Sequence, residues 1–428
     1  MNKLLLLPLA SGLALATPSR AQGPEKTDAA FLTAWRATHA QTRLPVLKTT
    51  QTKLSIREGE WMYRDRWRVS TAAKPDVFTA QPFKGKKRIV FYSDVDSMVF
   101  WVKPQKTYDF VVLLNGRDSA YTRITTQRGQ RPTLTPKLVF TRVRSGTSGP
   151  DTIGFRLDKN FGIHVQGSVN HSAPLDFLFD TGAGAVVLAQ ALVNQRVRLR
   201  QDGQTVNVGA DGRRSVATSS GNTLEMAGIR WPDVSLLTID YPGFGFDGVL
   251  GWVAFENKIV EVDYERGYLV IHDRLPATLA DYSPVDLQLR NGIPFIKCSL
   301  TANGQQSEEW FDLDTGSDGG VVVGQRFAAR RGLTSGLKRL GTAEASGSTG
   351  GVVHQTIFAL PKLKIGDYEL YQVPLYVNDQ DPAGGAIAEN IGSMLLKRFN
   401  LLLDFRLNRA YLKPNKYLYT PMKSEAAK

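Results

Sequence analysis

Hydrophobic positions between Leu54 and Arg144 fall in short runs that are typical of β-strands rather than of amphipathic helices. Val99 to Val102 and Tyr108 to Leu114 are two such runs, and Asn115-Gly116 directly after the second is a common hairpin turn. The Ser- and Gly-rich stretch from Ser145 to Pro150 indicates a linker. The pattern therefore predicts a small β-rich domain that ends near residue 150.

The rest of the chain contains one pattern twice. A strand-like apolar run leads to Asp180-Thr181-Gly182 and again to Asp314-Thr315-Gly316, and an apolar triplet follows each. Downstream, Val249-Leu250-Gly251 and Asn390-Ile391-Gly392 occupy matched places, each with an aspartate 12 residues after its glycine. Because two elements recur in the same order, we expect two lobes of one mainly β fold, residues 151–277 and 280–416.

The first residues have the features of a secretory signal. Lys3 precedes an apolar run from Leu4 to Ala16, and small residues flank a cleavage site after Ala21. The run is too short to span a bilayer comfortably, and no later stretch is long and apolar enough to do so. The sequence thus predicts a signal peptide over 1–21, a β-rich N-terminal domain over 22–150, and export to the periplasm or the extracellular space.

Composition narrows the chemistry. The chain of 428 residues has 53 basic and 40 acidic residues, a formal net charge of +13, but its basic clusters are not interleaved with aromatic side chains, so we expect no nucleic-acid partner. One cysteine, Cys298, and five scattered histidines exclude a disulfide framework and argue against a metal site. We predict no cofactor and no metal, and Cys298 lies in a strand-like run typical of a buried structural thiol.

The two aspartates suggest a chemistry. Packing the lobes about a pseudo-twofold axis would bring Asp180 and Asp314 together. Two adjacent carboxylates cannot both ionise easily, so the pair should hold one proton. The ionised member can take a proton from water while the protonated member polarises a peptide carbonyl. Such hydrolysis needs no metal and no covalent intermediate.

These loops resemble the active-site loops of pepsin-like and retropepsin-like aspartic peptidases, and residues 154–413 carry the resemblance. It implies a bilobal peptidase fold preceded by the smaller β-rich domain, with Asp180 and Asp314 as the catalytic pair. It implies that Thr181 and Thr315 join the loops, and that Gly182 and Gly316 lie against substrate or water. Ser317 is expected to hydrogen-bond its neighbouring aspartate and favour its ionisation, which the matched Ala183 cannot do.

The resemblance also implies flaps over the cleft. Val206 to Met226 and Gly341 to Gly351 are polar and Gly-rich and lie where flap hairpins would fall, although no aromatic residue occurs near the middle of the first. Short helical segments are expected at Ala189 to Gln195 and at Gly324 to Arg331. The glycine pattern from Gly243 to Gly248 lacks a following helix, which favours a loop over a dinucleotide site.

The sequence therefore favours an exported aspartic endopeptidase that acts on peptide or protein substrates as a monomer with an internal pseudo-dimer. The alternatives are a non-catalytic pepsin-like peptide-binding or scaffold module of the cell envelope, and lobes that pair between chains as retropepsins do. The N-terminal domain is either a pro-segment, with Lys86 or Arg88 neutralising the dyad, or a permanent docking domain, which we favour.

Overall fold

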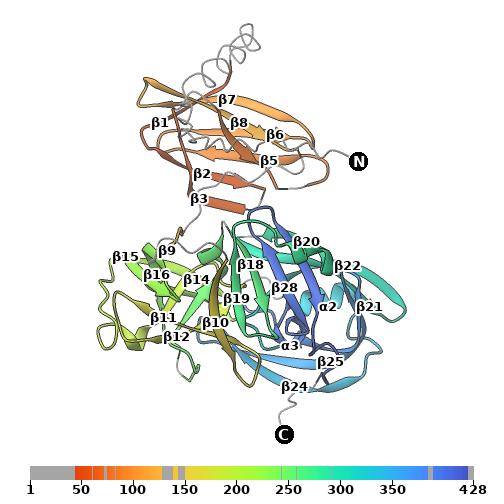
Figure 1. The fold of residues 1–428 in the computed structure, drawn as a ribbon. Helices are drawn as coiled ribbons and strands as arrows, with labels where there is room; N and C mark the ends of the chain where they lie inside the picture. Colours follow the sequence, from red (N-terminus) through yellow and green to blue (C-terminus); the bar gives the residue numbers. More distant parts are fainter. Residues whose placement is uncertain are drawn as a thin grey trace, which may run out of the picture.

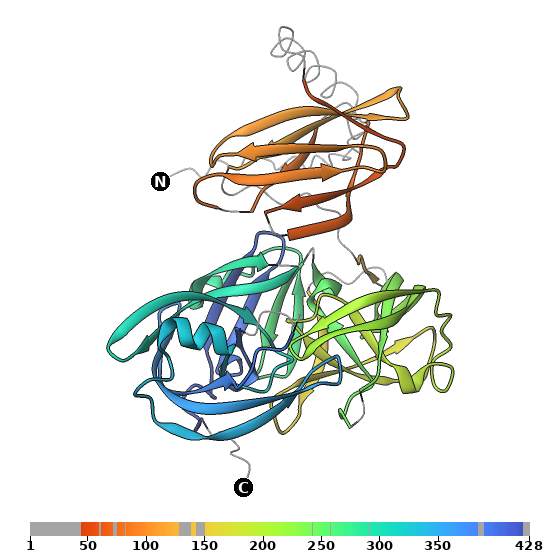
Figure 2. The ribbon, with the colours of Figure 1, turned by 180° about the vertical axis from the view of Figure 1, so that it is seen from behind.

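The computed structural model describes residues 44–59, 61–71, 75–81, 83–127, 138–142, 150–241, 243–256, 258–290, 292–383 and 389–422. The predicted signal peptide and most of the predicted linker lie outside these residues. The described chain is mainly β: a smaller N-terminal β domain followed by two larger β lobes (Figure 1). This confirms the predicted fold class. Viewed from behind, the lobes lie side by side below the N-terminal domain (Figure 2).

The N-terminal domain consists of two four-stranded sheets, ordered β1-β7-β8-β4 and β3-β2-β5-β6. Its strands are β1 (Val46–Thr49), β2 (Lys53–Glu58), β3 (Trp61–Arg68), β4 (Asp76–Thr79), β5 (Lys87–Tyr92), β6 (Ser97–Val102), β7 (Thr107–Leu114) and β8 (Asp118–Thr125). Phe91 is fully buried between the sheets, with edge-on ring contacts to Trp67, Phe78, Phe100 and Phe110. This aromatic core is separate from that of the lobes.

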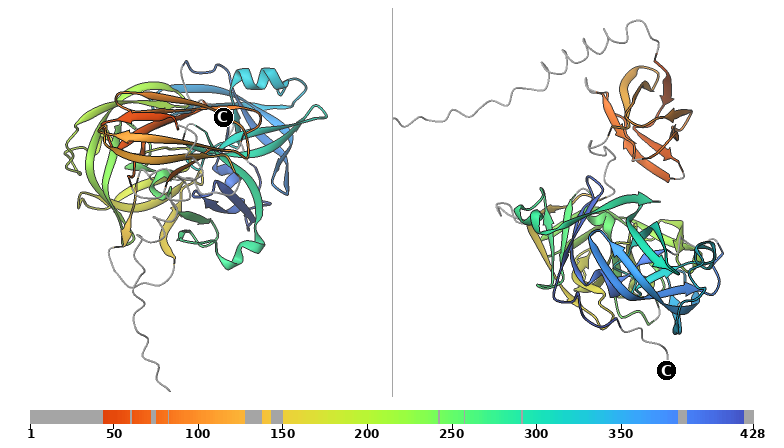
Figure 3. Two further views of the ribbon diagram at one scale, coloured as in Figure 1. Left: turned by 90° about the horizontal axis from the view of Figure 1, so that it is seen from above. Right: turned by 90° about the vertical axis from the view of Figure 1, so that its right-hand side faces the viewer.

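Arg66 and Gln81 of the N-terminal domain contact the lobes. Arg66 forms an ion pair with Glu256, and the Asn408 amide donates to Gln81 Oε1 at 2.7 Å. The turned views show the domain at one end of the lobes (Figure 3). Residues 138–142, which the sequence pattern placed in this domain, instead pack on the first lobe, where β9 (Thr141–Arg142) pairs with β16.

The first lobe is built from β10 to β19. Its elements are β10 (Asp151–Leu157), β11 (Ile163–Val169), β12 (Leu175–Asp180), β13 (Val186–Ala189), η1 (Gln190–Leu192), β14 (Gly203–Gly209), β15 (Gly212–Met226), β16 (Ile229–Ile239), β17 (Gly248–Gly251), η2 (Trp252–Phe255), β18 (Ile259–Asp263) and β19 (Tyr268–His272). The helical segment expected at Ala189 to Gln195 is only the single 3₁₀ turn η1. The Gly243 to Gly248 stretch is a loop that leads into β17, as expected.

The second lobe follows the connecting turn η3 (Ala277–Asp281) and repeats this order. Its elements are β20 (Ser283–Arg290), β21 (Ile293–Ala302), β22 (Gln305–Leu313), β23 (Val321–Val323), α2 (Gln325–Arg331), β24 (Arg339–Ser346), β25 (Val352–Ile365), β26 (Tyr368–Asn378), β27 (Asn390–Ile391), α3 (Ser393–Leu396), β28 (Phe399–Asp404) and β29 (Arg409–Pro414). Helix α2 covers the second expected helical segment, and Gly332 ends it in the left-handed conformation at φ 59°.

A shared sheet fixes the lobes to each other. Strand β18 of the first lobe pairs antiparallel with β28 of the second, from Ile259↔Asp404 to Val262↔Leu401. With β10 and β19 on one side and β29 and β20 on the other, the order is β10-β19-β18-β28-β29-β20. Continuous backbone pairing across the interface makes the two lobes of one chain a single body. This arrangement supports pairing of the lobes within one chain.

Cys298 on β21 provides a test of core integrity. Its side chain is 2% exposed, and burial raises the pKa of its thiol far above the usual value. We predict that the native protein resists alkylation by iodoacetamide at about pH 8. Mass spectrometry should show one modified thiol only after unfolding in urea, which serves as the control. Rapid labelling of the native protein would contradict this packing.

Candidate active site

Asp180 and Asp314 stand at the ends of the matched strands β12 and β22. Strand β12 runs parallel to β17, which places Asp180 opposite Gly251. Strand β22 runs parallel to β27 in the same way, pairing Leu313 with Ile391. Alternate residues of β12 and β22 enter the lobe cores, where Phe179 and Leu313 are fully buried. The strand ends therefore carry both aspartates to the interface between the lobes.

Reciprocal hydrogen bonds lock the two loops together. The amide of Thr181 donates to Thr315 Oγ1 at 3.0 Å, and the amide of Thr315 donates to Thr181 Oγ1 at 3.0 Å. Each hydroxyl in turn donates to a carbonyl of the other lobe, Thr181 to Leu313 and Thr315 to Phe179. Both threonines are fully buried. The two threonines thus join the loops, as the resemblance implied.

Gly182 and Gly316 lie directly against the carboxylates, whereas the resemblance implied contact with substrate or water. A methyl group at Gly182 would come within 2.8 Å of Asp314 Oδ1, and one at Gly316 within 2.4 Å of Asp180 Cγ. Neither glycine has a positive φ, so close approach rather than backbone conformation excludes a side chain. Each glycine therefore leaves the space that the carboxylate of the opposite lobe occupies.

The two carboxylates affect each other's pKa. Burial and the neighbouring charge of Asp314 raise the pKa of Asp180 well above its usual value, and a side-chain hydrogen bond joins the pair. Burial also raises the pKa of Asp314, but the hydrogen bond from Asp180 and the amides of Gly316 and Ser317 oppose that rise. Amides of Gly182 and Ala183 likewise oppose the rise at Asp180, so both pKa values are raised and ionisation of one carboxyl group disfavours ionisation of the other.

Asp314 has donors that favour its charged form. Its Oδ1 accepts from the amides of Gly316 at 2.9 Å and Ser317 at 3.1 Å, and its Oδ2 accepts from Asn390 Nδ2 at 3.3 Å. The sequence reasoning had suggested a hydrogen bond from the Ser317 hydroxyl. Ser317 instead contacts Asp314 through its backbone amide. The side-chain asymmetry between the loops comes instead from Asn390, since the matched residue Val249 has no donor.

The downstream glycines support the loops from below. A methyl group at Gly251 would lie 2.2 Å from the carbonyl oxygen of Ala185, and one at Gly392 would lie 2.4 Å from that of Gly319. The Ser393 hydroxyl also donates to the carbonyl of Thr315 at 2.8 Å. The two copies of the apolar-apolar-Gly element therefore hold the aspartate loops by backbone contact.

Two hairpins meet above the loops. The β14–β15 hairpin of the first lobe and the β24–β25 hairpin of the second include the predicted flap segments. At their tips, Asp211 accepts from the amides of Thr349 at 3.0 Å and Gly351 at 2.8 Å. The Asn207 amide donates to Ser348 Oγ at 2.8 Å. These contacts close the space over the carboxylates and do not need the aromatic residue that the first hairpin lacks.

A cleft of about 2680 Å³ runs between the lobes under these hairpins. On the first-lobe side, Tyr241, Phe244 and Phe246 pack edge to face or tilted, with ring centroids 5.2–5.6 Å apart. Burial and the nearby Asp180 raise the pKa of Tyr241. The sequence reasoning had treated this segment only as a loop, because the aromatic side chains converge only in the folded lobe.

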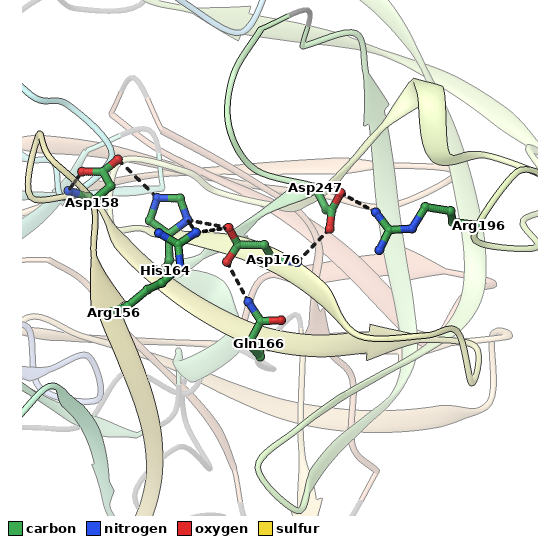
Figure 4. A network of polar contacts seen from close by, with 8 residues as sticks. Arg156, Asp158, His164, Gln166, Asp176, Arg196 and Asp247 are labelled. Atoms are coloured by element: carbon green, nitrogen blue, oxygen red, sulfur yellow. Dashed lines mark hydrogen bonds and ion pairs between the residues drawn. The ribbon is translucent and has the colours of Figure 1, made fainter.

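A polar network holds this aromatic loop to the lobe (Figure 4). Asp247, at the end of the loop, accepts from the amide of Asp176 at 3.0 Å and from Arg196 at 3.0 Å. Asp176 also faces His164 Nδ1 at 2.8 Å, and the other ring nitrogen of His164 faces Asp158 at 3.3 Å. His164 is 4% exposed, so both carboxylates reach it at a buried point. The network therefore fixes where the aromatic cluster enters the cleft.

The second-lobe side of the cleft has a different character. Asp312 and Asn390 are paired across β22 and β27, and both line the cleft. Burial and the charges of Asp314 and Asp180 raise the pKa of Asp312 well above its usual value. The sequence reasoning missed Asp312, although the internal repeat held the signal: the residue at the matched position of the first lobe is Leu178.

The close approach at Gly316 predicts the effect of a single methyl group. Gly316→Ala should destabilise the protein by about 1–3 kcal/mol, because the new methyl group overlaps the Asp180 carboxylate. Denaturant unfolding measures the change. Gly245→Ala is the matched control, because the added methyl group would have no other atom within 4 Å. It should leave stability within about 0.5 kcal/mol. Equal stability of Gly316→Ala and the native chain would contradict the contact.

The donor at Asn390 predicts a titration shift. The Asn390 amide stabilises the charged form of Asp314, so Asn390→Val should raise the lower pKa of the pair by roughly 0.5–1 pH units. On acidification, the singly charged pair would then take up its second proton at a higher pH than in the native protein. Carbon NMR of labelled aspartates measures the titration. An unchanged or lowered pKa would show that the amide does not bear on the carboxylate.

Comparison with known families agrees with this geometry. The model of the aspartyl protease family matches the chain twice, over residues 165–253 and 298–394. The first match includes Asp180 and Gly251, and the second includes Asp314 and Gly392. No curated protein matches the chain in sequence. The two matches fall one on each lobe, so the two lobes carry the domain of the aspartyl protease family, of the retropepsin-like clan, twice.

Proposed function

We propose that this protein is an exported aspartic endopeptidase in which Asp180 and Asp314 activate a water molecule. The observation that carries the proposal is the pairing of two matched aspartate loops, locked by reciprocal threonine hydrogen bonds, which places both carboxylates in the cleft between the lobes. An exported chain agrees with the leader-like first 21 residues. No helix in the described part of the chain is long and apolar enough to cross a membrane.

The geometry supports a direct hydrolysis. Ionised Asp314 takes a proton from water as the water oxygen attacks the carbonyl carbon, and Asp180 gives its proton to the carbonyl oxygen. The tetrahedral intermediate then returns a hydroxyl proton to Asp180. The C–N bond breaks as the leaving nitrogen takes the proton from Asp314. The pair thus regains its starting protonation after one peptide bond is cleaved.

The cleft favours an extended peptide substrate that continues on both sides of the cleaved bond. It runs past both lobes and is covered by the two hairpins, so a peptide must enter along its length or part the tips at Asp211. Opening of this kind is a common gating step in enzymes that exclude water during the reaction. We therefore propose internal cleavage of flexible segments rather than removal of terminal residues.

The N-terminal domain is proposed to be a permanent part of the protein. The residues that line the cleft all belong to the two lobes, as far as the described ranges extend, and Lys86 and Arg88 are not among them. The contacts at Glu256 and Asn408 also lie outside the cleft. This favours a docking domain over a pro-segment that plugs the site.

The alternative is a peptide-binding or scaffold module that keeps the loops without cleaving. The hydrogen-bonded hairpin tips are the observation that favours it, because a closed cleft suits retention of a ligand. The two readings differ in turnover, so a direct assay of cleavage separates them.

Removal of either carboxylate should abolish cleavage. We predict that the purified protein cleaves a peptide library somewhere between about pH 3 and 8, is inhibited by pepstatin, and loses at least about 10³-fold in rate in both Asp180→Asn and Asp314→Asn. Asp286→Asn is the matched control, because Asp286 is exposed on β20 and does not line the cleft, and it should leave cleavage intact. Cleavage that survives in either dyad variant would contradict a shared site, and no cleavage by the unmodified protein would favour the binding module.

A further inference from the structure

The two halves of the cleft differ at one pair of matched positions. Leu178 stands two residues before Asp180, and Asp312 stands two residues before Asp314. Leu178 pairs with Val249 across β12 and β17, and Asp312 pairs with Asn390 across β22 and β27. Side chains two residues apart on a strand point to the same face, so each pair adjoins its own catalytic candidate. One lobe thus presents an apolar pair to the cleft and the other presents a polar pair.

The polar pair has hydrogen-bonding capacity that nothing in the described protein uses. Asp312 Oδ1 and Asn390 Oδ1 are both shut off from solvent and have no hydrogen-bond partner. Both atoms can accept a hydrogen bond, so a donor brought by a ligand would satisfy them. Polar atoms buried without a partner are rare in native proteins because their desolvation is not compensated. Two of them side by side in a substrate cleft indicate a site that is completed by a ligand.

The surrounding charges indicate a cation. Asp180, Asp312 and Asp314 all line the cleft, and the charges of Asp180 and Asp314 raise the pKa of Asp312, so the three carboxyl groups are within electrostatic range of one another. Arg290 also lines the cleft, but its guanidinium stacks 5.3 Å from the Phe295 ring and 5.0 Å from the Trp310 ring. The charges that act on Arg290 are those of Glu309 and Glu389. It therefore faces these two acids rather than Asp312.

A metal ion is a poorer fit than an organic cation. Within the described ranges, no three His, Cys, Asp or Glu side chains are arranged to hold a metal ion. An ammonium or guanidinium group instead brings several N–H donors on a long apolar stem. Such a side chain can reach both orphan oxygens while its stem packs along the cleft wall.

We propose that Asp312 and Asn390 form a subsite for a lysine or arginine side chain on the second-lobe side of the cleaved bond. The inference rests on the proposed peptidase function and names its substrate class. The matched subsite of the first lobe, with Leu178 and the aromatic cluster of Tyr241 and Phe246, takes an apolar side chain. The preferred substrate is therefore a peptide with an apolar residue and a basic residue on opposite sides of the cleaved bond.

Two physical reasons support this pairing. Neighbouring side chains of an extended peptide point in opposite directions, so the residues that flank the bond over the dyad enter opposite lobes. A cation also relieves the repulsion among the three carboxyl groups, which an apolar or neutral side chain would leave in place. The same acidity makes an acidic residue at this position strongly unfavourable.

Cleavage products and binding of uncleavable peptides test the inference separately. Mass spectrometry of library products should show Lys or Arg enriched at one of the two positions that flank the cut. In parallel, peptides with a reduced –CH₂–NH– bond would carry Lys, norleucine or Gln before or after that bond. The Lys peptide should bind the unmodified protein roughly 10- to 100-fold more tightly than the norleucine peptide, which keeps the stem but lacks the charge.

Asp312→Leu installs the residue of the matched position and should abolish this preference. Asp312→Asn, which keeps the shape without the charge, should reduce it as well. Glu308→Leu is the matched control on the same strand, because Glu308 is exposed, pairs with Lys297 and does not line the cleft. It should leave the preference intact. Thermal unfolding checks that the Asp312 variants remain folded.

The outcomes separate the two proposals. Loss of all cleavage with a retained Lys preference in binding would overturn the peptidase function but support the subsite. Equal binding of Lys and norleucine peptides, Gln binding as tight as Lys, or a preference that survives Asp312→Leu would overturn the subsite, even if the protein cleaves peptides.

Discussion

The reciprocal hydrogen bonds of Thr181 and Thr315 are the contact on which the site depends. Each threonine amide donates to the hydroxyl of the other, and each hydroxyl donates to a carbonyl across the interface. Because the whole cluster is buried, none of these groups can exchange its partner for water without a large cost. The bonds therefore hold the two carboxylates at short range even though their mutual repulsion disfavours it. The β18–β28 pairing extends the same constraint over the length of the interface.

Close contacts at the glycines of the two loops impose a second constraint. Gly182 and Gly316 leave room for the opposing carboxylates, while Gly251 and Gly392 let backbone carbonyls pass beneath the loops. With the threonine bonds these contacts build a symmetric frame. Within that frame the two lobes differ in side chains that line the cleft, and Asn390 and Asp312 are two such differences beside the dyad. A symmetric backbone thus supports an asymmetric charge distribution, which is what acid–base chemistry between two like groups requires.

Much of this arrangement could be predicted from the sequence because it depends on local pattern. Strand-like runs, the Asn115-Gly116 turn and the paired Asp-Thr-Gly loops are short-range signals, and the internal repeat supplied the lobes. Prediction was weaker where a contact joins distant residues. Residues 138–142 pack on the first lobe through Trp231 and not on the domain that precedes them. This outcome is not encoded in the neighbouring residues.

The sequence by itself determined the mainly β class, the duplication and the identity of the paired loop residues, because each depends on residue type and spacing along the chain. Only the tertiary structure decided which groups meet: the approach of Asp314 that raises the pKa of Asp180, the hydrogen bonds of Asp211 between the hairpin tips, and the effect of two other carboxyl groups on Asp312. These properties arise from burial and from distances between residues far apart in the chain. The pKa of a buried carboxyl group depends on the charges and hydrogen-bond donors around it, and folding alone brings those groups together.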